Sequence, residues 1–229
     1  MDGFLMLLRW FHFLFGITWI GLLYYFNLVQ VPFFGETEPA VRSGAIQKLV
    51  PRALWWFRWS AMGTVVIGWA YLMAKWGNEG FSWTPYNVAI LTGGVLGTVM
   101  FLNVWLVIWP NQKIVIASAV AVAGGGQADP AAAPAGRRAA LASRTNTVFS
   151  VPMLYFMGAA AHYGLFTEAS TGGLWAWGIL GLAIIAAVEL NALVGTQGPT
   201  KKPLDTVKGT ITSGFVLWAV LFLLIRIVM

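Results

Sequence analysis

Six long apolar segments run through this sequence, at about 4–34, 54–76, 86–109, 141–166, 174–194 and 207–229. A helix needs about 20 mostly apolar residues to cross the hydrocarbon core of a bilayer, and each segment reaches that length. Isolated strands are excluded in such segments, because they would leave their backbone polar groups unpaired in lipid. The segments therefore predict an all-α, polytopic membrane protein, a helical bundle with about six transmembrane helices.

The composition excludes a soluble protein. Hydrophobic residues make up 59% of the chain and charged residues 10%, whereas a small soluble domain carries about 25–35% charged residues on its surface. We therefore expect a single transmembrane domain over residues 1–229. Between the third and fourth segments, residues 124–138 are rich in glycine, alanine and proline, which predicts a flexible loop.

The basic residues indicate how the segments cross the membrane. Three alternate connections hold most of them: Arg42, Lys48 and Arg52; then Lys113, Arg137, Arg138 and Arg144; then Lys201, Lys202 and Lys208. The other two connections carry Glu79 and Glu168 and no basic residue. The positive-inside rule places the basic connections in the cytoplasm and both termini outside it. The net charge of +6 is thus explained by topology, and no nucleic-acid partner is expected.

Two histidines, His12 and His162, fall inside predicted spans. An ionisable side chain is costly in a bilayer, so each is a candidate functional residue. The two spans run in opposite directions, which brings both imidazoles to the outer half of the membrane. Two such imidazoles can supply both axial ligands of a non-covalent, b-type haem. Alternatively they form hydrogen bonds between helices, or serve in metal binding or proton transfer.

Three residues near His12 fit the haem hypothesis. Gly16 and Trp19 follow His12 at spacings that keep all three on one helical face, and the glycine leaves room for a flat macrocycle. Arg9, one turn further out, is a candidate partner for a haem propionate; alternatively its side chain extends to the membrane surface. Cysteine is absent from the sequence, which excludes disulfides, thiolate metal sites and covalently attached c-type haem.

Glu189 is the carboxylate that lies deepest within a predicted span, and Asn103 of the third span lies at a similar depth. This pair is interpreted either as part of a proton path or quinone contact, or as a hydrogen bond between neighbouring helices.

Three strings in the sequence resemble a known family. They are LRWFHFLFGITWIGLLYYFNLVQVP in the first span, GTVMFLNVWLVIWPNQK in the third and SRTNTVFSVPMLYFMGAAAHYGLF in the fourth. In this order they resemble the membrane domain of bacterial membrane-bound urate oxidases, the urate oxidase N-terminal domain family. Its motif residues correspond to His12, Gly16 and Trp19, and to Asn146, Phe149, Pro152, His162 and Tyr163.

The resemblance implies a protein of the bacterial inner membrane that is associated with urate oxidation. Family members commonly continue into a periplasmic c-type cytochrome domain; this cysteine-free sequence lacks it, so electrons would need another carrier. We therefore predict a membrane redox protein that binds haem b and passes electrons to quinone or an external cytochrome c. Whether the chain is itself an oxidoreductase is left open. The alternative is a structural or assembly subunit, without cofactor, of a larger respiratory or photosynthetic membrane complex.

Overall fold

The computed structural model describes residues 3–229, and these form helices and connecting loops without any strand. The first two residues of the predicted domain 1–229 lie outside the described residues. In chain order the elements are α1 (Gly3–Tyr24), the π-helix η1 (Tyr25–Gln30), α2 (Val31–Glu36), α3 (Pro39–Lys48), α4 (Val50–Glu79), α5 (Pro85–Leu102), the π-helix η2 (Asn103–Ile108), α6 (Trp109–Ala123), α7 (Ala132–His162), α8 (Thr171–Leu193), the 3-10 helix η3 (Pro199–Asp205) and α9 (Val207–Val228). The predicted all-α fold is confirmed.

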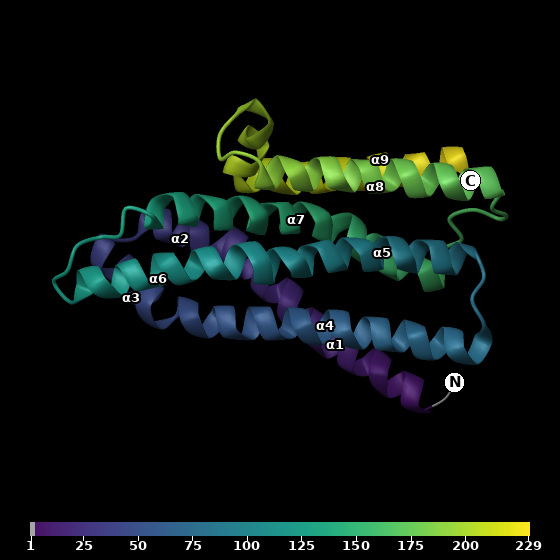
Figure 1. Ribbon diagram of the computed structural model, residues 1–229, viewed down its shortest axis with the longest axis horizontal. Helices are drawn as coiled ribbons and strands as arrows, with labels where there is room; N and C mark the ends of the chain where they lie inside the picture. Colours follow the sequence, from purple (N-terminus) through teal and green to yellow (C-terminus); the bar gives the residue numbers. More distant parts are fainter. Residues whose placement is uncertain (1–2) are drawn as a thin grey trace.

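The long helices run roughly along one axis (Figure 1). Helices α8 and α9 form one side of the bundle, α7 and the continuous α5–η2–α6 rod lie in the middle, and α4 lies on the far side with α1 crossing it obliquely. Helix α1 begins and α9 ends at the same end of the molecule (Figure 1). The α4–α5 and α7–α8 connections also lie there, whereas α3, the α6–α7 loop and η3 gather at the opposite end.

Within residues 3–229, four stretches are long and apolar enough to cross a membrane: Gly3–Glu36, Pro85–Ala123, Thr171–Leu193 and Val207–Val228. The other two predicted spans correspond to α4 and α7, which have 30 and 31 residues but are more polar. Helix α7 is central, and its buried side chains include Thr145, Asn146 and Ser150. Because these polar groups face protein rather than lipid, average hydropathy understates how well such a helix suits a bundle interior.

Some boundaries differ from those expected. The rod that contains the third predicted span continues through α6 to Ala123, well past the predicted end at residue 109. Helix α7 begins at Ala132, so the second half of the predicted loop 124–138 is helical. Alanines at 132, 133, 135, 139 and 140 explain this, because alanine is the best helix former.

Both π-helices come directly before a proline-containing helix start, at Pro32 in α2 and Pro110 in α6. Proline has no N–H to donate within the helix. Just before it, the amide of Val31 donates to the carbonyl of Phe26, five residues back, and Trp109 donates in the same way to Val104. Each proline therefore accompanies a widened turn, the geometry often found at functional positions.

Each π-helix also carries a buried asparagine that bonds to α7. Asn27 in η1 donates through Nδ2 to Ser143 Oγ at 2.8 Å. Asn103 in η2 donates through Nδ2 to Asn146 Oδ1 at 2.9 Å. Polar hydrogen bonds of this kind hold helices together where lipid gives no hydrophobic drive. They fix α1, α5 and α7 around the site described next.

Candidate functional site

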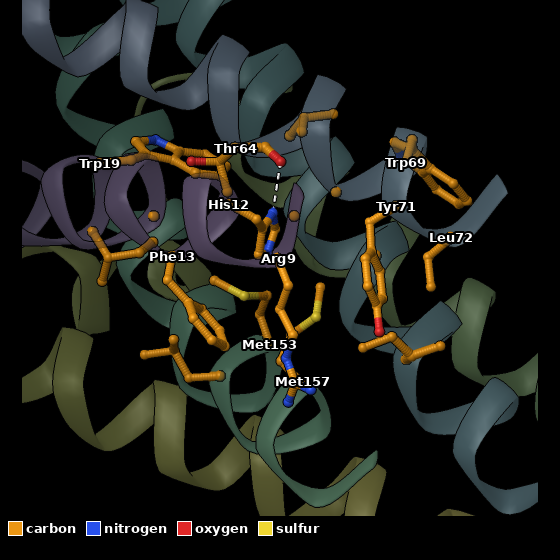
Figure 2. A pocket seen from close by; sticks show the side chains of 18 of the residues that line it. Arg9, His12, Phe13, Trp19, Thr64, Trp69, Tyr71, Leu72, Met153 and Met157 are labelled. Atoms are coloured by element: carbon orange, nitrogen blue, oxygen red, sulfur yellow. Dashed lines mark hydrogen bonds between the residues drawn. The ribbon is translucent and has the colours of Figure 1, made fainter. Parts of the chain in front are cut away.

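A cavity of about 550 Å³ lies between α1, α4, α5 and α7 (Figure 2). This volume is in the range of small-molecule and cofactor sites, about 300–1,000 Å³. The residues that line it include Arg9, His12, Gly16 and Trp19, four of the five residues expected to bind a cofactor. The structure therefore brings these four predicted residues to one cavity.

The imidazole of His12 is held against α4. Its Nδ1 lies 2.8 Å from the carbonyl oxygen of Thr64, and Figure 2 shows this bond reaching from α1 to α4. A Cβ atom placed on Gly68 would lie 2.8 Å from both Nδ1 and Cε1 of the ring. Position 68 therefore needs glycine for the ring to lie where it does. With Nδ1 donating to Thr64, Nε2 is the unprotonated nitrogen, the form in which histidine binds a metal.

Two glycines widen the cavity without being needed for contacts between helices. A Cβ on Gly97 of α5 would meet no atom within 4 Å, and one on Gly16 would meet only Thr64 Cγ2 at 3.8 Å. Both residues line the cavity. Their missing side chains thus leave flat backbone facing the empty volume, as the sequence predicts for Gly16.

The outer part of the cavity is cationic. Arg9 and Lys75 line it together with the phenols of Tyr71 and Tyr86, and no carboxylate of residues 3–229 belongs to this lining. The Nζ atom of Lys75 lies 5.3 Å from the centre of the Tyr86 ring and 2.5 Å from Oε2 of Glu79, one turn further along α4. Within residues 3–229, Arg9 has no carboxylate at ion-pair distance. This end of the cavity can therefore receive the acidic groups of a ligand.

The deeper part of the cavity contains an unsatisfied donor. Trp19 is 1% exposed, and its indole Nε1 has no hydrogen-bond partner. Buried donors are normally paired, so this indole is an exception among the residues of the lining.

Helix α7 contributes two methionines that sequence reasoning missed. Met153 and Met157 are four residues apart and both line the cavity (Figure 2). Met157 lies over α5, where a Cβ on Gly93 would be 2.9 Å from its Cγ. The sequence did offer one signal for them: Met153, Met157 and Ala161 are spaced by four residues, which places all three on one face of the helix. Thioether sulfur can ligate haem iron, so these side chains extend the chemistry of the cavity.

His162 lies outside this lining. It is the last residue of α7, and its side chain is exposed. Ala161 lines the cavity and His162 does not, because consecutive residues on a helix are turned by about 100° from each other. The structure therefore does not bring the two imidazoles together, and the pairing of His12 with His162 remains a prediction.

A separate polar cluster joins α8 to the centre of the bundle. The Nδ2 group of Asn103 donates to Oε2 of Glu189 at 2.9 Å as well as to Asn146, and Nδ2 of Asn146 donates to the carbonyl of Met100. Of the two interpretations of Glu189, the hydrogen bond between neighbouring helices is confirmed. Among residues 3–229, no group of three or more histidine or acidic side chains could hold a metal ion.

Comparison with known proteins gives one match. The family model described as "Urate oxidase N-terminal" matches residues 78–224, which contain the second and third of the strings quoted above and span α5 to most of α9. The first string, with His12, precedes the matched region. No curated protein and no solved structure matches the chain. Because the family model covers more than half of its residues, the chain belongs to the urate oxidase N-terminal family.

Proposed function

We propose that this protein is a membrane redox protein that holds haem b in the cavity between α1, α4, α5 and α7, where His12 would ligate the iron. The hydrogen bond from His12 Nδ1 to the Thr64 carbonyl is the observation that carries the proposal. Histidines that bind metals nearly always donate their other ring nitrogen in this way, which fixes the tautomer and the ring orientation.

The remaining cavity residues suit the parts of a haem. Arg9 would pair with a propionate, Lys75 could do so only in exchange for its ion pair with Glu79, and Gly16 and Gly97 would leave room for the macrocycle. When bound, haem supplies one-electron transfer, at a potential tuned by the axial ligands, burial and nearby charge. The chain's own contribution is to orient the His12 ring through Thr64 and to neutralise the propionates.

The second axial position has candidates of two kinds. His162 is the ligand predicted from the sequence, and reaching the iron would require the end of α7 to turn. Met153 and Met157 already line the cavity. Histidine–methionine ligation gives a higher reduction potential than ligation by two histidines, so spectroscopy and redox titration distinguish these arrangements.

We further propose that α4 and α7 also span the membrane, giving six spans with both termini on the periplasmic side of a bacterial inner membrane. Support comes from the gathering of α3, the α6–α7 loop and η3 at the end opposite the start of α1 and the end of α9 (Figure 1). Of the basic residues, Arg42 and Lys48 lie in α3, Arg137 and Arg138 near the start of α7, and Lys201 and Lys202 in η3. The cavity would then lie in the outer half of the bilayer. In this arrangement the protein passes electrons from urate oxidation to quinone in the bilayer or to an external cytochrome c.

The test is a reduced-minus-oxidised absorption spectrum of protein purified from cells that make haem. We expect Soret and α bands in the wild type and neither band in His12→Ala. Gly77→Ala is the matched control, because a Cβ at Gly77 would meet no atom within 4 Å and the residue is outside the cavity. A wild-type protein without a Soret band would overturn the proposal. It would favour the cofactor-free subunit, which should then co-purify with partner proteins whether or not His12 is present.

A further inference from the structure

A second hollow lies far along the chain from the first, between α8 and α9. It is an open groove of about 770 Å³ with α7 as its floor, and it shares no lining residue with the haem cavity. The two helices meet at one end, where a Cβ on Gly173 would lie 2.4 Å from the carbonyl oxygen of Val228. At the other end the groove reaches the loop that contains η3, where Thr200, Pro203 and Leu204 line it.

The floor of the groove holds an unsatisfied hydroxyl. Thr145 of α7 is 1% exposed and lines the groove, yet its Oγ1 has no hydrogen-bond partner. Other threonines here donate to their own helix: Thr147 to the carbonyl of Ser143 and Thr210 to that of Thr206. Leaving a buried hydroxyl unpaired costs about 1–3 kcal/mol. The side chain is therefore suited to an acceptor oxygen that a ligand brings into the groove.

The wall formed by α9 changes from charged to apolar along its length. Lys208 stands at the rim, Thr212 and Ser213 follow one turn later, and Val216 and Val220 come after successive further turns. At 1.5 Å per residue this series covers about 18 Å. The facing wall of α8 has the same order, with Asn191 near the rim and Val188 and Ile184 deeper. An amphiphile with its polar head at the basic end of the bundle matches this profile.

The charge around the rim is positive. Lys208 lines the groove, and Arg144 donates to the carbonyl of Leu204, a residue of the groove. The nearby carboxylate of Asp205 is already paired with Arg137 at 2.7 Å. Among the described residues, no carboxylate lines the groove. An anionic head group is thus favoured over a zwitterionic or neutral one, as in other basic pockets between membrane helices.

We propose that this groove binds the head group and glycerol backbone of an anionic glycerophospholipid. Its phosphate pairs with Lys208 at the rim, an ester carbonyl accepts the Thr145 hydroxyl, and the acyl chain follows Val216 and Val220 into the bilayer. The bound lipid fills the groove between α8 and α9 and ties α8 to the bundle. This inference rests on the proposed insertion in a membrane but not on the binding of haem.

The experiment uses the full chain in mild detergent, delipidated and then titrated with phosphatidylglycerol, with phosphatidylcholine as the neutral comparison. Bound lipid is counted by native mass spectrometry, and haem is followed by absorbance in the same samples. Thr145→Val keeps the shape of the side chain and removes the hydroxyl, and Lys208→Gln removes the charge. Lys202→Gln is the control, because Lys202 is exposed and lies outside the groove.

We expect one phosphatidylglycerol per chain, bound more tightly than phosphatidylcholine. Each groove variant should weaken it by about tenfold, the effect of roughly 1.4 kcal/mol, and Lys202→Gln should not. Equal binding of the two lipids, or unchanged binding in both groove variants, would overturn the proposal. Displacement of the lipid by an equimolar quinone would assign the groove to that carrier instead. A protein that binds the lipid but shows no haem bands would refute the redox proposal alone.

Discussion

Replacing Gly68 by alanine tests the positioning of His12 without touching the imidazole itself. The new Cβ would lie 2.8 Å from both Nδ1 and Cε1 of the ring, whereas ordinary contacts begin near 3.4 Å. The ring must therefore retreat from α4 by about 0.6 Å. A retreat of that size directed away from α4 lengthens the bond from Nδ1 to the Thr64 carbonyl from 2.8 Å to about 3.4 Å, beyond the usual range.

Gly68→Ala changes two contacts of the imidazole, its hydrogen bond to Thr64 and its packing against position 68, and each change has an expected cost. Partners that orient a metal-binding histidine typically contribute 10–100-fold in metal affinity, and we expect haem affinity to fall by about that factor in Gly68→Ala. Overpacking adds a cost in stability of about 1–3 kcal/mol, which should appear as a lower Tm of the haem-free protein. Gly77→Ala, on the same helix but facing open space, should change neither quantity.

The assay is titration of haem-free protein with haemin, followed through the Soret band, together with thermal unfolding of each variant before haem is added. Thermal unfolding separates a general loss of stability from a loss of ligand orientation. If Gly68→Ala binds haem with the affinity and spectrum of the wild type, His12 is not held by Thr64 as a ligand, and the reasoning fails.

Three further predictions concern other parts of the molecule. Because His162 is exposed and outside the cavity, His162→Ala should retain haem that His12→Ala loses; loss of the low-spin spectrum in His162→Ala would instead establish the paired histidines. Asn103→Leu should lower the free energy of unfolding by about 1–3 kcal/mol, since it leaves buried polar partners unpaired, as measured by thermal unfolding in detergent; an unchanged Tm would contradict this. Since the chain has no cysteine, single substitutions Glu168→Cys and Lys202→Cys should react with an impermeant thiol reagent from opposite sides of the membrane, and labelling from one side would refute the six-span arrangement.

The helical architecture could be predicted from the sequence because a chain in lipid has few ways to satisfy its backbone hydrogen bonds. Long apolar segments must satisfy their own backbone groups, so α1, α8 and α9 appear where hydropathy places them. The π-helices were missed because a widened turn depends on how the carbonyls before Pro32 and Pro110 are satisfied. The pattern of apolar residues in the sequence gives no information about these backbone hydrogen bonds.

The candidate site was predicted in part for a similar reason. Arg9, His12, Gly16 and Trp19 share one face of a single helix, so helical periodicity alone groups them. Which residues of other helices face them depends on packing between segments far apart in the sequence. Thr64 and Gly68 could not be identified in advance, because their roles arise from how α4 docks against α1.

The polar interior of α7 has a consequence for biogenesis. A segment that carries Asn146 and several hydroxyls has little tendency to enter lipid alone, yet in the bundle Asn146 is fully buried and bonded to Asn103 and Met100. Asn103 and Met100 precede α7 in the chain, so they leave the ribosome first. In the proposed six-span arrangement they are already in the bilayer when α7 emerges. In that arrangement, insertion of this helix is coupled to docking, and the nascent protein assembles around α7 rather than as a set of independently stable spans.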